Sequence, residues 1–213
     1  MTDYLKAATR ANETLIRYNI RRTPVQPLPI LEQIENVKVA TFAELHNASS
    51  VDLCRLGGGK FRDSCSMIYS ENRKRKYLVA YNDLLPNPVL QKSLMTELGH
   101  VVLGHTERSA ENETEAKFFA LHILCPRPLV HLMQAISMRI TEDLLANLTG
   151  TLHETLFEIR RAPGVAVPAR INRFIGNQFL PFMLNYFEYC RDVKPPDGSA
   201  LVDFGTYMES YEE

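Results

Sequence analysis

The residues of this chain best suited to chemistry lie in the run T-E-L-G-H at positions 96–100. Zinc peptidases use the pattern H-E-x-x-H, in which two imidazoles lie one helical turn apart and the intervening glutamate acts on a metal-bound water as general base. Here Glu97 and His100 occupy the second and fifth positions, and Thr96 occupies the first. A threonine hydroxyl stays protonated near neutral pH and is a poor zinc ligand. Taken alone, the run is a weak indication of a metal site.

A second segment supplies a further carboxylate. The run E-A-K-F-F-A-L-H-I-L-C-P at positions 115–126 begins with Glu115, 15 residues beyond His100. Both segments are predicted to be helical, and an antiparallel pair of such helices would bring Glu115 back beside His100 as a further metal ligand. The two runs together therefore favour a metal site more strongly than either does alone.

These motifs resemble those of the ImmA/IrrE family of bacterial and phage metallo-endopeptidases. Members typically show a strand that ends in tyrosine-asparagine, then H-E-L-G-H, then E-A-N-x-F-A-A-x-L-L-M-P. This chain has V-A-Y-N at positions 79–82, followed by the two runs described above. The resemblance is specific from about residue 75 to residue 126, and it is looser in the N-terminal part and around Thr149–Thr151.

The resemblance implies a zinc-dependent endopeptidase that cleaves a DNA-binding repressor or a similar regulatory protein of a phage or mobile element. In the family, zinc is held by both motif histidines and by the glutamate of the second helix. Carried over to this chain, Glu97 matches the general base, and His100 and Glu115 match two metal ligands. The third ligand position falls on Thr96, so the motif is degenerate there.

The threonine leaves three hypotheses open. The protein is a catalytically inactive pseudopeptidase that binds its partner as a regulatory module, or it is an enzyme that recruits a substitute ligand such as Cys65, His46 or His105. In the third hypothesis, metal binds only when the substrate supplies a donor. On an ideal helix His105 lies about 140° around the axis from His100, which is a poor position for a shared ligand. We expect His105 to be a packed or capping side chain.

Hydrophobic periodicity, prolines and capping residues predict the elements that position these residues. The predicted helices run from Tyr4 to about Asn19, Ile30 to about Glu35, Pro86 to about His105, Ser109 to Leu124, Leu152 to about Ala162 and Ala169 to Val193. The predicted strands are Val37–Thr41, Cys65–Tyr69 and Lys76–Tyr81, and the last two form a hairpin. Thr141 is expected to be an N-cap, and Gly99 and Gly104 are expected to permit close helix packing and helix termination.

These elements predict an α+β fold, in which a small, zincin-like antiparallel sheet packs on the two motif helices and a helical C-terminal part follows. We expect a metallopeptidase-like domain at residues 1–135 and a helical region with a candidate helix-turn-helix-like element at 136–194. An acidic tail at 195–213 is predicted to be disordered.

Composition indicates an ordinary globular protein and narrows its partners. The 213 residues are 45% apolar and 23% charged, with a net charge of −1. This balance argues against a broad nucleic-acid-binding surface, so we expect a protein partner and no direct DNA binding. No signal peptide or membrane-spanning run is evident, and the four cysteines are scattered. We expect a cytoplasmic protein with reduced thiols and no membrane partner.

Overall fold

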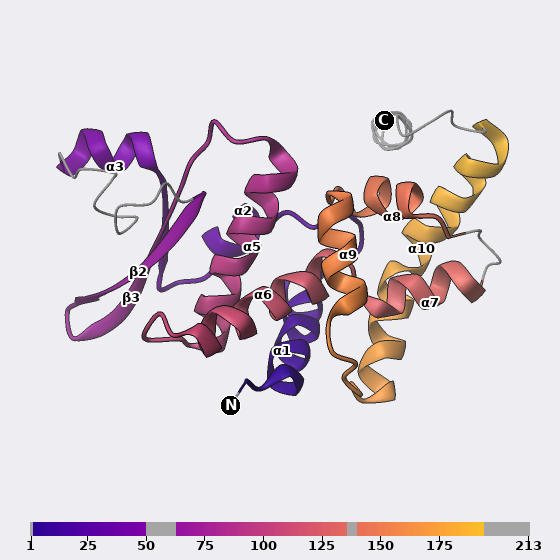
Figure 1. Cartoon of the computed structure of the whole chain (residues 1–213), viewed down its shortest axis with the longest axis horizontal. Helices are drawn as coiled ribbons and strands as arrows, with labels where there is room; N and C mark the ends of the chain where they lie inside the picture. The colour runs from indigo at the N-terminus through magenta and orange to yellow at the C-terminus, as the bar shows by residue number, and fades with distance from the viewer. Residues whose placement is uncertain (1, 50–62, 136–139, 194–213) are drawn as a thin grey trace. The chain divides into compact units, whose positions relative to one another are not determined.

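The computed structural model describes residues 2–49, 63–135 and 140–193 (Figure 1). The chain forms two compact units: residues 1–11 with 26–120, and residues 12–25 with 121–213. The boundaries between these units fall inside the first helix, α1 (Tyr4–Arg17), and inside α6 (Ala110–Leu124). The division expected near residue 135 stays a prediction, and the expected tail at 195–213 lies outside the described residues.

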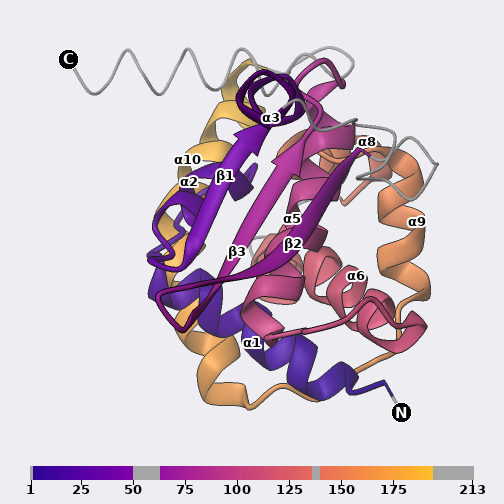
Figure 2. The same ribbon diagram turned by 90° about the vertical axis from the view of Figure 1, so that its left-hand side faces the viewer.

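The first unit is built on a three-stranded sheet with the order β1-β3-β2 (Figure 2). The strands are β1 (Val37–Thr41), β2 (Ser64–Glu71) and β3 (Lys74–Tyr81). β2 and β3 form the predicted antiparallel hairpin, whose turn residues Asn72 and Arg73 both have positive φ, as tight hairpin turns require. The α+β class is confirmed, but the expected wholly antiparallel sheet is wrong because β1 pairs with β3 in parallel. β2 begins at the end of the sheet where β1 finishes, because Thr41 and Ser64 both pair with Tyr81. β2 therefore runs antiparallel to β1, and β3 runs parallel to β1.

The helices of the first unit cover and extend this sheet. They are the first part of α1, α2 (Pro27–Glu32), α3 (Phe42–Ser49), α5 (Asn87–Leu103) and the larger part of α6. α5 packs against β2, β3 and α2, and its buried side chains Leu94, Met95 and Leu98 join the core. α3 was not expected from the sequence. The motif residues of α5 are therefore held beside the sheet.

A glycine lets the two motif helices approach closely. A Cβ atom on Gly99 would lie 2.8 Å from the carbonyl oxygen of Ala116 and 3.1 Å from the ring of Phe119. Such distances are well inside van der Waals contact, so no larger residue fits without movement. The expectation that Gly99 permits close helix packing is confirmed.

The end of α5 differs from the expected helix in a way that reshapes the site. Helix α5 ends at Leu103, and Gly104 follows in the left-handed region with φ 72°. The N–H of His105 then donates to the carbonyl of His100 at 3.0 Å, which closes the helix end. Helix termination at Gly104 is confirmed, but the helix does not reach His105.

The second unit is helical in the described residues, as predicted. It contains α7 (Arg127–Ala135), α8 (Glu142–Thr149), α9 (His153–Arg161) and α10 (Ala169–Val193). Thr141 is the N-cap of α8, where its hydroxyl accepts a hydrogen bond from the N–H of Leu144, and Gly150 ends that helix with φ 64°. α7 packs on α10. Among the described helices, none is long and apolar enough to cross a membrane.

We predict that Gly99→Ala lowers the free energy of unfolding by about 1–3 kcal/mol, because the new methyl group collides with the backbone of α6. Chemical denaturation followed by circular dichroism measures the change. The matched control is Gly176→Ala on α10, where an added Cβ meets nothing within 4 Å. A methyl group at that helical position should stabilise the protein by up to about 1 kcal/mol. Equal effects of the two variants would contradict the close approach at Gly99.

Candidate functional site

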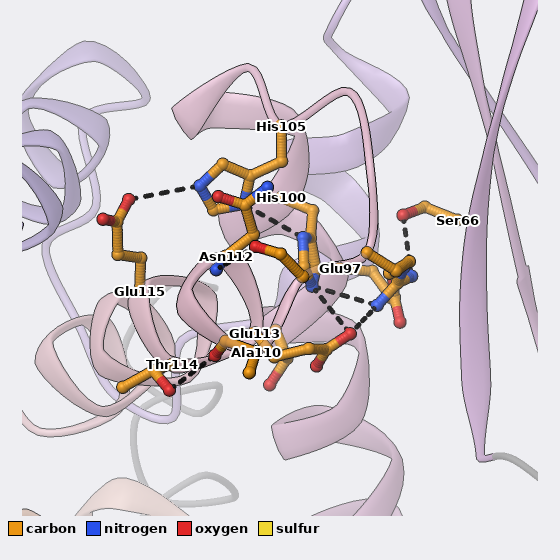
Figure 3. Close-up of polar contacts among 12 residues, drawn as sticks. Ser66, Glu97, His100, His105, Ala110, Asn112, Glu113, Thr114 and Glu115 are labelled. Atoms are coloured by element: carbon orange, nitrogen blue, oxygen red, sulfur yellow. Dashed lines mark hydrogen bonds and ion pairs between the residues drawn. The ribbon is translucent and has the colours of Figure 1, made fainter. Parts of the chain in front are cut away.

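The carboxylate of Glu97 and the imidazole of His100 lie on one face of α5 and are almost fully buried, with 4% and 2% exposure (Figure 3). Their spacing of three residues places them one turn apart. The two oxygens of Glu97 have different partners. Oε1 accepts a hydrogen bond from the hydroxyl of Ser64 on β2 at 3.5 Å, and Oε2 accepts one from Arg108 at 2.5 Å.

Arg108, between α5 and α6, is the centre of this site. Its Nη1 donates to Nε2 of His100 at 3.0 Å and to Oε1 of Glu113 at 2.6 Å. Its Nη2 donates to Oε2 of Glu97 at 2.5 Å and to the hydroxyl of Ser66 at 3.0 Å. Each terminal nitrogen of a guanidinium carries two hydrogens, so all four are directed at protein acceptors. The fork thus joins α5, α6 and β2.

The contact with Arg108 fixes the protonation of the two histidines. Arginine can only donate, so Nε2 of His100 must accept and its Nδ1 must carry the proton. Nδ1 of His100 lies 3.0 Å from Nδ1 of His105, and Nε2 of His105 lies 3.3 Å from Oε2 of Glu115. The other oxygen of Glu115 accepts from the backbone N–H of Asp3 at 2.7 Å. The hydrogen bonds therefore run in one direction, from Arg108 through both imidazoles to Glu115.

The charges of this site are set by burial and by Arg108. The Arg108 guanidinium, which donates to Oε1 of Glu113 at 2.6 Å, holds the pKa of that carboxyl well below its usual range. Burial opposes the charge of Arg108, but Glu97 and Glu113 outweigh it and raise the pKa of the guanidinium. Burial lowers the pKa of His105, although Glu115 opposes this. The charged groups of the site are thus paired around the guanidinium of Arg108.

The structure brings the three predicted site residues into one cluster but not around one point. His105 lies between His100 and Glu115, and the carboxylate beside Nε2 of His100 belongs to Glu113 (Figure 3). Residues two apart on a helix point about 200° apart, so Glu113 and Glu115 face different parts of the site. The ligand roles of His100 and Glu115 and the base role of Glu97 stay predictions.

Sequence reasoning missed several residues of the cluster. The angle expected between His100 and His105 assumed a continuous helix, but the left-handed Gly104 ends α5 and turns His105 back toward His100. His105 is a buried side chain, as expected, and its poor placement as a shared ligand stays a prediction. Gly104 was the signal that could have placed it. Glu113 could have been considered from the E-T-E spacing, whereas Arg108 lies in a connection without any periodic pattern.

The residues present do not fit the zinc site implied by the motif. The Thr96 hydroxyl donates to the carbonyl of Lys92 on its own helix at 3.0 Å, and the lone pair of His100 Nε2 that a metal would use accepts from Arg108. The suggested substitutes Cys65 and His46 lie on β2 and α3. Across the described ranges, no three His, Cys, Asp or Glu side chains are gathered as a metal site.

Comparison with known families shows which family the segment around the cluster is similar to. The model of the IrrE N-terminal-like domain, a peptidase family, matches residues 60–156. The matched segment, 97 of the 213 residues, is similar to this family. The match contains both motif helices and every residue of the cluster except Asp3, and it confirms the resemblance drawn from the sequence. No curated protein and no solved structure gives a significant match.

We predict that His100 carries its proton on Nδ1 and that His105 carries its proton on Nε2. Two-bond proton–nitrogen correlation spectra at pH 7 distinguish protonated from bare ring nitrogens, and His100→Gln and His105→Gln variants assign the signals. The exposed His131 is the control and should show averaged nitrogen shifts. A proton found on Nε2 of His100 would rule out the contact with Arg108 as described.

Proposed function

We propose that this protein is a metallopeptidase-like module that binds a regulatory protein without hydrolysing it. The observation that carries the proposal is the engagement of Glu97, which occupies the general-base position of the family. Both of its oxygens accept hydrogen bonds from the protein, one from Ser64 and one from Arg108. A general base must instead reach the proton that it removes. The threonine at position 96, which supplies no metal ligand, supports the same conclusion.

An extended peptide from the partner is the class of ligand that the sheet favours. In the described part of the sheet, β2 lies at the edge, and its Ser66 contacts Arg108. An edge strand offers unpaired backbone groups that an added strand can bond. A peptide added along β2 would therefore run past the cluster. This placement supports recognition of an unfolded or extended segment.

The family implies a DNA-binding repressor or a similar regulator as the partner. We propose the same class of partner for this protein. The near-neutral net charge supports contact with the protein rather than with its DNA. Such a partner places the protein in the cytoplasm. A zinc-dependent endopeptidase acting on the same partner is the competing function, and the first experiment below separates the two.

We predict that Glu97→Gln leaves control of the repressor unchanged, because the proposed module acts by binding. The probes are repressors encoded near the gene for this protein. Calorimetry should give dissociation constants for wild type and variant within about threefold of each other. Mass spectrometry should find the repressor intact after incubation with wild type. Cleavage by wild type that is absent with Glu97→Gln would establish the peptidase instead.

We predict that Ile68→Lys weakens repressor binding by about tenfold or more, because Ile68 is an exposed apolar side chain on β2 and edge contacts supply the affinity. Leu84→Lys is the matched control, since Leu84 is more exposed and lies between β3 and α5. Its binding should stay within about twofold of wild type. If both variants bind like wild type, the peptide does not use β2, and the result for Glu97→Gln is unaffected.

A further inference from the structure

Three acceptors with no hydrogen to share converge in this site. Glu97 and Glu113 both form ion pairs with Arg108, and His100 presents a bare nitrogen to the same guanidinium. Glu97 is buried, and an uncompensated buried charge is strongly unfavourable. In a metallopeptidase a divalent cation compensates the negative charge of such acceptors. Here the only group that contacts all three acceptors, among the described residues, is the guanidinium of Arg108.

We propose that Arg108 is the resident cation of this site and has replaced the metal ion of the family. The guanidinium matches the three acceptors both in charge and in geometry. A guanidinium presents donors in a rigid planar fork, which suits several acceptors at fixed positions. Nη1 of Arg108 donates to His100 and Glu113, and Nη2 donates to Glu97. The second hydrogen of Nη2 is donated to a fourth acceptor, the Ser66 hydroxyl on β2.

The guanidinium and a metal ion exclude one another at this place. Nη1 of Arg108 lies 3.0 Å from Nε2 of His100, whereas zinc requires the same lone pair at about 2.0–2.1 Å. Two cations on one imidazole would also repel each other strongly in a partly buried site. Restoring a histidine at position 96 therefore does not restore a metal site while Arg108 stays in place.

Arg108 also differs from an ordinary surface arginine. The side chain of Arg160 pairs with Glu142 while both remain about half exposed, at 60% and 48%. Such a pair contributes little to stability. By contrast, Arg108 is 30% exposed and its partner Glu97 is 5% exposed. Removing Arg108 leaves a buried carboxylate without its counter-charge, and removing Arg160 does not.

The first experiment measures zinc affinity directly, by metal analysis and competition with a chromophoric chelator. The proteins are the full-length wild type, Thr96→His, and the double variant Thr96→His with Arg108→Ala. We expect the double variant to bind one zinc at least about tenfold more tightly than Thr96→His. Wild type should retain no stoichiometric zinc after dialysis. Equal affinity of Thr96→His and the double variant would overturn the proposal, and so would stoichiometric zinc in wild type that is lost in His100→Ala.

The second experiment measures thermal unfolding and does not depend on the double variant being folded. The melting temperature of wild type should be the same with a chelator and with added zinc. Arg108→Met should melt about 5–10 °C lower than wild type or fail to fold, and Arg108→Lys should also be destabilised because an ammonium lacks the fork. Arg160→Met is the matched control and should melt within about 2 °C of wild type. An Arg108→Met protein as stable as this control, or a wild type that chelators destabilise, would refute the proposal. Neither result bears on whether the protein binds a repressor.

Discussion

The contact between one guanidinium and three acceptors holds the site of this protein together. Glu97 and His100 come from α5, Glu113 comes from α6, and Arg108 lies in the connection between these helices. Without a cation among them, two carboxylates and an imidazole lone pair would repel one another, and the burial of Glu97 would be unfavourable. The charge of Arg108 therefore determines whether α5, α6 and β2 can meet where they do.

The hydrogen-bond direction beyond Arg108 follows from the same contact. Because His100 must accept at Nε2, it donates from Nδ1 to Nδ1 of His105. His105 then donates from Nε2 to the carboxylate of Glu115. Glu115 in turn holds the backbone of Asp3 at the start of the chain. One permanent donor thus orders polar groups that span more than a hundred positions in the sequence. A metal ion would impose the same polarity on the imidazole, since it also requires the lone pair of Nε2.

Local signals were enough to predict much of the fold and part of the site. Thr141 marked the start of α8, and the strands Val37–Thr41 and Lys76–Tyr81 were found with nearly correct bounds. The parallel pairing of β1 with β3 was missed because strand order depends on contacts distant in sequence. Likewise the motif placed Glu97 and His100 on one helical face. Arg108 contacts them only because α5 ends at Gly104 and the following connection turns back toward that face. No periodicity describes a connecting segment, so its side-chain partners must come from the structure.

Thr96 and Arg108 are best understood as two parts of one change. A threonine at the first motif position removes a metal ligand, and a guanidinium beside His100 makes the remaining acceptors stable without metal. The two cations nevertheless differ in chemistry. Zinc lowers the pKa of a bound water to about 7, whereas a guanidinium is a hydrogen-bond donor and not a Lewis acid, so it does not activate a bound water in this way. An arginine attached to the chain keeps the charge balance and the shape of the site, and it gives up the means of activating a nucleophile. Retention of the fold without a hydrolytic step is the combination that the proposed protein-binding module requires.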